Sequence, residues 1–141
     1  MSLDEYIKGE TLKSLRFYGD SASKTFYEKL AEKKFETTKC RDCGEVFFPP
    51  RVLCPHCLST SLEWTPLSGR GVLYAFSWQE RGVRFVKPDV LGLVDLEDCA
   101  GRIFSRIAGK YEDLGIGMPL RIDFVEVHPG FFLHQFVPDP R

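Results

Sequence analysis

Two cysteine pairs, Cys40-Arg41-Asp42-Cys43 and Cys54-Pro55-His56-Cys57, form the stretch of this sequence that says most about its fold. Ten residues separate the two pairs. Two residues between cysteines allow a tight turn that directs both sulfurs at one ion, and two such turns complete a tetrahedral shell. Gly44, directly after the first pair, suits the positive φ that such a turn can require. The spacing therefore predicts a metal site.

A shell of four thiolates leaves no position for water or substrate, so we interpret the metal as a structural zinc. An electron-transfer iron in the same ligand set is the main alternative. The predicted ligands are Cys40, Cys43, Cys54 and Cys57. The fifth cysteine, Cys99, stands apart beside Asp98 and is interpreted as an inert thiol.

The residues before the cysteine segment have helical spacing. Phe26 and Leu30 are four residues apart and would share one face of a helix, which Asp20 or Ser21 could cap. A weaker helix is predicted before it, around Gly9. These residues predict an N-terminal helical segment, residues 1–36, ahead of a zinc ribbon, residues 37–66.

After Gly71 the apolar residues alternate, beginning with Val72, Tyr74, Phe76 and Trp78, which is typical of β-strands. The predicted strands cover residues 72–78, 90–96, 103–107, 120–127 and 131–137. Five strands with a longer connection between the third and fourth match an OB-fold barrel, residues 67–141. An open sheet or a sandwich is the alternative topology. The predicted fold class is mainly β with N-terminal helices, a rubredoxin-like zinc ribbon and then a five-stranded OB-fold barrel.

Composition limits the possible function. The chain has 141 residues with 19 Lys+Arg and 20 Asp+Glu, so general attraction to phosphate does not favour nucleic-acid packaging. It contains no apolar run near the roughly 20 residues that span a bilayer. The charged first 30 residues do not resemble a secretory signal. We therefore expect a cytoplasmic protein without membrane contact, in which paired cysteines bind metal instead of forming disulfides.

Several motifs in combination resemble a known family. They are Phe26-Tyr27-Glu28, Cys40-x-x-Cys43-Gly44, Phe48-Pro49-Pro50-Arg51, Cys54-Pro55-x-Cys57, Glu63-Trp64, Leu67-Ser68-Gly69-Arg70-Gly71 and Val72-x-Tyr74. Over about residues 24–137 the chain is similar to the acyl-CoA-associated proteins with a rubredoxin-like zinc ribbon and an OB-fold, long catalogued as DUF35. Two positions differ from the family pattern: Leu58 stands where the second knuckle often has glycine, and Pro88-Asp89 replaces a proline-aromatic pair.

The resemblance implies a non-catalytic accessory or scaffold protein. Such proteins assist thiolase-like or HMG-CoA-synthase-like enzymes and help to hold acyl-CoA. The alternative function is an OB-fold protein that binds single-stranded nucleic acid, which the near-neutral charge and the short His128-Pro129-Gly130 turn make less favourable. Catalysis is not expected, because His56, His128 and His134 stand in no recognisable nucleophile–base arrangement.

Two groups of residues are candidates for ligand contacts. The loop between the first two barrel strands carries Arg81, Arg84, Phe85 and Lys87, which could meet the phosphates and adenine of CoA or a nucleic-acid strand. A solvated hairpin tip is the alternative interpretation of this loop. Arg51, in the segment between the cysteine pairs, could anchor a phosphate or a partner's carboxylate. Trp64 and Trp78 are interpreted as core or module-interface residues.

Overall fold

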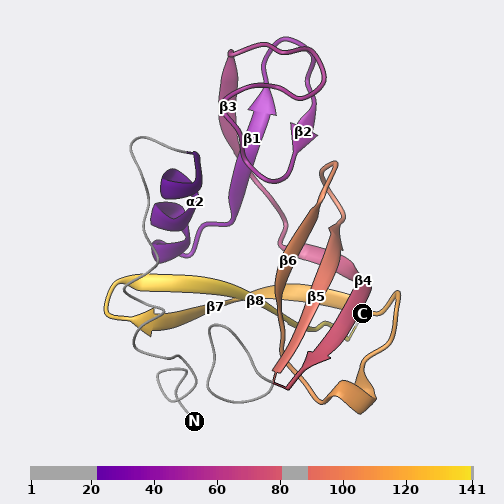
Figure 1. The fold of residues 1–141 in the computed structure, drawn as a ribbon. Helices are drawn as coiled ribbons and strands as arrows, with labels where there is room; N and C mark the ends of the chain where they lie inside the picture. The colour runs from indigo at the N-terminus through magenta and orange to yellow at the C-terminus, as the bar shows by residue number, and fades with distance from the viewer. Residues whose placement is uncertain (1–21, 81–88, 141) are drawn as a thin grey trace.

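The computed structural model describes residues 22–80 and 89–140, which form an α-helix, a three-stranded sheet and a closed five-stranded barrel (Figure 1). The elements are α2 (Ala22–Ala31), β1 (Glu36–Cys40), β2 (Val46–Phe47), β3 (Leu62–Pro66), β4 (Arg70–Gln79), β5 (Asp89–Leu96), β6 (Arg102–Ile107), the 3-10 helix η2 (Tyr111–Asp113), β7 (Pro119–His128) and β8 (Phe131–Pro138). The predicted fold class is therefore confirmed. The weaker N-terminal helix falls outside this description.

Helix α2 forms where helical spacing predicted it. Phe26 and Leu30 are its buried residues. The helix ends because Lys33 adopts a left-handed backbone with φ of 58°, and the Lys34 N–H returns to the carbonyl of Lys29 at 2.9 Å. The predicted caps, Asp20 and Ser21, lie outside the described residues. No helix within residues 22–80 and 89–140 is long and apolar enough to cross a bilayer.

The three-stranded sheet carries the cysteine pairs and has the order β2-β1-β3, with antiparallel pairing throughout. Its central strand, β1, buries Thr37 and Thr38. The Thr37 hydroxyl donates to the Phe47 carbonyl at 2.6 Å, so this polar side chain is satisfied inside the sheet. This sheet stands above the barrel in Figure 1 and positions the two cysteine turns at its far end.

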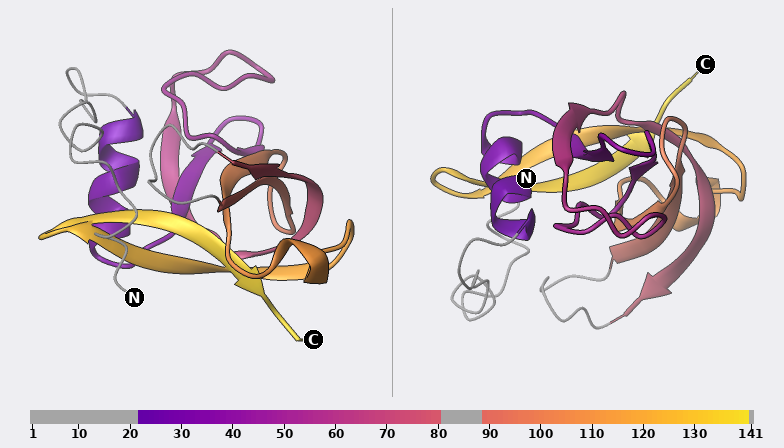
Figure 2. Two further views of the ribbon diagram at one scale, coloured as in Figure 1. Left: turned by 60° about the horizontal axis from the view of Figure 1, so that its bottom comes forward. Right: turned by 90° about the horizontal axis from the view of Figure 1, so that it is seen from above.

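The barrel has the strand order β4-β5-β6-β8-β7. β4 pairs with both β5 and β7, which closes the sheet on itself, and β6 meets β8 through a short parallel contact. The β7–β8 hairpin extends past the barrel beneath α2 in Figure 1, and both views of Figure 2 show it reaching out to one side of the barrel. All five predicted strands and the predicted turn at Pro129 and Gly130 are confirmed.

One hydrophobic core serves both the helix and the barrel. Phe26, Leu30 and Phe35 belong to the same buried cluster as Leu73 and Phe136 of the barrel interior. Further barrel members of this cluster are Val90, Val94, Leu96, Ile103, Ile107 and Leu120. The three-way division into residues 1–36, 37–66 and 67–141 stays a prediction, and the shared core shows that α2 packs against the barrel.

Backbone hydrogen bonds join the ribbon to the barrel. The Ala100 N–H donates to the Val46 carbonyl at 2.9 Å, and the Phe48 N–H donates to the Ala100 carbonyl at 3.0 Å. Phe48 also packs against Phe26 with ring centroids 5.7 Å apart. The turn between β5 and β6 is thus fixed to the ribbon directly after β2.

Asp89, at the start of β5, is a buried acid. It is 4% exposed, and its carboxylate lies 3.6 Å from Arg106 Nε with no hydrogen-bond partner among the described residues. Burial raises the pKa of the Asp89 carboxyl, and the nearby Arg106 guanidinium opposes this effect. Because the pKa of Asp89 is higher in the folded protein than in the unfolded chain, protonated Asp89 contributes to stability. This contribution is fully present at pH values below the unfolded-state pKa, and it is lost as pH rises through the folded-state pKa.

We therefore expect Asp89→Asn to raise the free energy of unfolding at pH 7 by about 1 kcal/mol, because the amide avoids burying a charge. The gain should disappear near pH 3, where the wild-type carboxyl carries a proton. Urea unfolding at both pH values measures this difference. Asp95→Asn, at a less buried position of the same strand, should show no gain. A destabilised Asp89→Asn variant at pH 7 would mean that the Arg106 ion pair outweighs the burial of charge.

Candidate functional site

The four predicted ligands are brought together at the far end of the ribbon. The sulfurs of Cys40, Cys43, Cys54 and Cys57 all lie within 4.8 Å of one another. Two of the separations are 3.5 Å, for Cys40 and Cys57, and 3.7 Å, for Cys43 and Cys54. A tetrahedron with Zn–S bonds of 2.3 Å has edges of about 3.8 Å, so the cluster fits a four-coordinate zinc.

Both cysteine turns use the same backbone pattern. In the first, the Gly44 N–H donates to the Cys40 carbonyl at 3.0 Å, and in the second the Leu58 N–H donates to the Cys54 carbonyl at 3.0 Å. Backbone N–H groups of Cys43 and Cys57 approach the Cys40 and Cys54 sulfurs at 3.5 Å each. The amides therefore orient the sulfurs inward and partly neutralise thiolate charge.

The ionisation of these thiols also favours a cation between them. The backbone N–H of Cys43 lowers the pKa of the Cys40 thiol to about 7. The Ser59 N–H favours a thiolate at Cys57, but the adjacent thiols, led by Cys40, raise the pKa of Cys57 to about 12. Cys40 thus forms a thiolate readily and Cys57 resists, because like charges would gather at one point. A divalent cation removes that repulsion.

The second turn contains a strained residue. Leu58 has φ of 63°, in the region where L-residues with side chains are disfavoured, and Gly44 occupies the matching position of the first turn with φ of 77°. Leu58 is 68% exposed, so its side chain contributes little packing there. The departure from the family's usual glycine, seen in the sequence, is thus accommodated by the backbone and not by a different turn.

We expect Leu58→Gly to stabilise the protein by about 0.5–1 kcal/mol, because glycine adopts this backbone without steric strain. Thermal unfolding of the zinc-loaded protein measures the effect. The matched change, Gly44→Leu, should destabilise by a similar or larger amount. If both variants shift the melting temperature in the same direction, backbone strain is not the cause.

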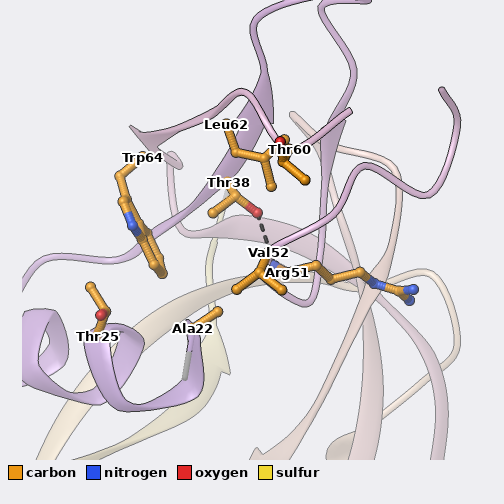
Figure 3. A pocket seen from close by; sticks show the side chains of 8 residues that line it. All are labelled: Ala22, Thr25, Thr38, Arg51, Val52, Thr60, Leu62 and Trp64. Atoms are coloured by element: carbon orange, nitrogen blue, oxygen red, sulfur yellow. Dashed lines mark hydrogen bonds between the residues drawn. The ribbon is translucent and has the colours of Figure 1, made fainter. Parts of the chain in front are cut away.

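Arg51 lines a cavity of about 250 Å³ between the start of α2 and the ribbon (Figure 3). The other lining residues are Ala22, Thr25, Thr38, Val52, Thr60, Leu62 and Trp64. The Arg51 backbone N–H donates to the Thr38 hydroxyl at 3.0 Å, whereas its guanidinium points away from the other labelled side chains. The predicted role of Arg51 in ligand binding stays a prediction.

The other predicted ligand contacts are Arg81, Arg84, Phe85 and Lys87, and they lie outside the described residues. The loop begins after β4 and returns at β5, as the sequence predicted. Their role in CoA binding therefore also stays a prediction.

His134 and Cys99 take the structural roles expected from the sequence. The Ser105 hydroxyl donates to the His134 carbonyl at 3.2 Å and lies 2.7 Å from His134 Nδ1, while Ser105 is only 4% exposed. A hydroxyl this close to an imidazole could be a nucleophile beside its base, but the burial of Ser105 restricts the access of a substrate, so we interpret the pair as structural. Burial and the Asp98 carboxylate raise the pKa of the Cys99 thiol to about 11, which disfavours the reactive thiolate at neutral pH.

The prediction for Trp78 is wrong. Trp64 packs against the hydrophobic core, but Trp78 is 48% exposed, and its indole N–H donates to the Glu80 carboxylate at 3.0 Å. The sequence analysis also missed Phe104, which is 62% exposed on β6. The alternation of Ile103 and Ile107 with Phe104 was a signal that could have placed this ring on the outer face.

This geometry defines the class of protein: a rubredoxin-like zinc ribbon joined to a closed OB-fold barrel. Comparison with protein families agrees, because residues 28–63 match the ChsH2 rubredoxin-like zinc ribbon domain and residues 64–125 match the ChsH2 C-terminal OB-fold domain. The chain belongs to the DUF35 family. Zinc is accordingly its cofactor, and the resemblance seen in the sequence is confirmed.

Curated relatives and a solved structure extend this comparison. A DUF35 domain-containing scaffold protein of Methanocaldococcus jannaschii is 38% identical over 91 residues, covering 61% of this chain and 64% of the relative. The benzoylsuccinyl-CoA thiolase subunit BbsA of Thauera aromatica is 39% identical over 72 residues, covering 50% of this chain and 49% of BbsA. The chain thus spans less than two thirds of either relative.

A solved structure described as the Ltp2-ChsH2(DUF35) aldolase is similar to this chain, with a TM-score of 0.77 and 25% identity. The similarity covers 87% of this chain and 98% of the solved one. The shared region therefore includes both the ribbon and the barrel.

Proposed function

We propose that this protein is a non-catalytic accessory subunit that docks on a thiolase-like or HMG-CoA-synthase-like enzyme and helps to hold its acyl-CoA. In this proposal Cys40, Cys43, Cys54 and Cys57 bind one structural zinc. Two observations together carry the proposal. The four-cysteine metal centre has no open coordination position, and relatives of the chain are named as a scaffold protein and as a thiolase subunit.

The names of the relatives support the choice of partner. One is a subunit of a benzoylsuccinyl-CoA thiolase, and the solved structure bears the name of an aldolase together with ChsH2(DUF35). Both names join a protein similar to this chain to an enzyme that makes or breaks carbon–carbon bonds. A thiolase-like enzyme is accordingly our first choice, and an HMG-CoA-synthase-like enzyme and a cytoplasmic location stay predictions from the resemblance and the sequence.

The chemistry of the ribbon favours a structural role over a catalytic one. When bound, zinc in a four-thiolate shell supplies a crosslink between two turns, since no coordination position is left for a reacting molecule. Around it, the Ser59 hydroxyl donates to the Asp42 carboxylate and so ties the second turn to the first. These residues stabilise the folded ribbon, and the surface of the folded protein is what a partner enzyme would recognise.

The proposal is tested by co-expressing the chain with the thiolase-like enzyme encoded nearest to its gene and purifying through a tag on the chain. We expect a stoichiometric complex with thiolase activity, and no turnover of acetoacetyl-CoA by the chain alone. Acyl-CoA should bind the free chain weakly and the complex more tightly, because the partner encloses the ligand. Robust turnover by the pure chain, or tight and salt-sensitive binding of single-stranded DNA without any enzyme partner, would contradict the proposal.

A further inference from the structure

The four cysteines of the metal centre differ in their access to solvent. Cys40 and Cys54, the first of each pair, are buried, whereas Cys43 and Cys57, the second of each pair, are exposed. The centre therefore has a buried side and a solvent-facing side. A competing chelator reaches the centre at the exposed sulfurs, and complete release of zinc requires the two cysteine turns to let go of it in succession.

A hydrogen bond joins the two turns on this solvent-facing side without involving the sulfurs. The Ser59 hydroxyl donates to the Asp42 carboxylate, and both side chains are exposed. Asp42 directly precedes Cys43, and Ser59 stands two residues after Cys57. The bond thus links the chain beside one exposed ligand to the chain beside the other.

The Ser59 hydroxyl is oriented for this contact by its own turn. The Ser61 N–H donates to Ser59 Oγ at 3.0 Å, and the Cys54 N–H donates to the Ser59 carbonyl at 2.9 Å. A serine hydroxyl has one proton to donate, and because its oxygen already accepts from Ser61, that proton is directed to Asp42. The second turn therefore presents a preorganised donor.

The Asp42 side of the bond is aligned as well. The Arg41 N–H donates to the Ser61 carbonyl at 2.9 Å, and Arg41 Nε donates to the Glu63 carboxylate at 3.4 Å. These contacts hold the chain after the second turn alongside the first turn. Since hydrogen bonds to a carboxylate are stronger than those between neutral groups, the aligned pair resists separation of the turns.

We propose that the hydrogen bond between Ser59 and Asp42 is a latch across the solvent-facing side of the metal centre, and that these two positioning residues slow the release of zinc. While the latch is closed, the chain beside Cys43 and Cys57 stays together, so a ligand that detaches is returned to the metal before a competitor takes its place. This inference goes beyond the proposed function, because it concerns retention of the metal and does not depend on which enzyme the chain binds.

The test follows zinc release from the zinc-loaded full chain into an excess of the chromogenic chelator pyridylazoresorcinol. Ser59→Ala is expected to release zinc about tenfold faster than wild type, as removal of a group that positions metal ligands does. Ser61→Ala is the matched control, because Ser61 contributes its backbone N–H and carbonyl to these contacts and alanine keeps both. Its release rate should lie within about twofold of wild type.

Variants of Asp42 distinguish a hydrogen bond from a simple effect of charge. Asp42→Ala should release zinc about tenfold faster than wild type. Asp42→Asn keeps an accepting oxygen and should be only about threefold faster, because a hydrogen bond to a neutral amide is about half as strong. The double variant Asp42→Ala/Ser59→Ala should again be about tenfold faster, since one and the same bond is lost in all three alanine variants.

Three results would overturn the latch. They are release from Ser59→Ala at the wild-type rate, equal rates for Asp42→Asn and Asp42→Ala, and a double variant about a hundredfold faster, which would mean that the two residues act independently. Should Ser59→Ala fail to take up one zinc per chain, the two Asp42 variants decide the question, because both leave Ser59 in place. Failure of the chain to bind a thiolase-like enzyme would contradict the proposed function and leave these rates unaffected.

Discussion

Replacing Cys40 by serine is expected to abolish stoichiometric zinc binding and to unfold the ribbon at 25 °C. Cys40 is fully buried, and its sulfur lies 3.5 Å from that of Cys57. The ribbon's own core is small, since Cys40, Cys54 and Phe47 are its buried members. Because folding of such sites is coupled to metal binding worth about 10–16 kcal/mol in isolated zinc-finger peptides, the remaining apolar contacts cannot replace the metal.

The damage should extend into one defined part of the barrel. Ala100, in the turn between β5 and β6, is hydrogen-bonded to Val46 and Phe48 of the ribbon. Loss of the ribbon leaves these backbone groups without their partners. Hydrogen exchange should therefore accelerate at Phe48 and Ala100, while the amides of the β7–β8 hairpin keep most of their protection.

Elemental analysis tests the predicted loss of zinc, and hydrogen exchange tests the predicted loss of protection. Cys99→Ser is the matched control, because Cys99 lies outside the four-sulfur cluster, and it should keep one zinc per chain. Treatment of the wild type with a strong chelator should reproduce the exchange pattern of Cys40→Ser. Purified wild-type protein that contains iron with a reversible redox couple, or no stoichiometric metal, would contradict the assignment of a structural zinc.

The metal centre could be predicted from the sequence because its determinants are local. Each C-x2-C pair fixes its own turn, and Gly44 supplies the backbone freedom that the first turn uses. The positive φ of Leu58 was not predictable, because a leucine does not by itself favour that backbone. Leu58 adopts this backbone because the second cysteine turn requires it, and its N–H donates to the Cys54 carbonyl there.

The strands were predictable, but their buried faces were only partly so. The alternation of Val72, Tyr74, Phe76 and Trp78 located β4, yet Leu73 is the fully buried residue, and Tyr74 is 47% exposed. An irregularity in pairing between Leu73 and Ala75 shifts the register there. A one-residue shift turns the following side chains to the other face, and a period of two in the sequence cannot reveal it.

Contacts between distant segments were the least predictable feature. The bridge between Phe47 and Ala100 joins residues 53 positions apart, and no local pattern indicates it. The same holds for the approach of Arg106 to Asp89. These contacts decide how the ribbon sits on the barrel, so that arrangement could be learned only from the structure.

Gly101→Ala is expected to destabilise the protein by about 3 kcal/mol, because it forces the ribbon away from the barrel. Gly101 follows the bridging residue Ala100 and has φ of 144°. A Cβ at this position would lie 2.3 Å from the Phe48 carbonyl oxygen, which is a backbone atom that cannot move without the ribbon. Relief of this clash requires the Phe48–Ala100 hydrogen bond of 3.0 Å to break.

Gly117→Ala separates this clash from backbone strain. Gly117 has φ of 87°, but a Cβ there would meet nothing within 4 Å, so its substitution should cost only about 1 kcal/mol. Urea unfolding compares the two variants, and zinc analysis should show that both keep the metal, since neither touches a sulfur. The loss of stability in the Gly101→Ala variant should then appear as faster amide hydrogen exchange at Ala100, while the zinc site stays intact. Equal destabilisation by the two alanines would show that the ribbon is held by the metal and the shared core alone, without a contribution from the bridge.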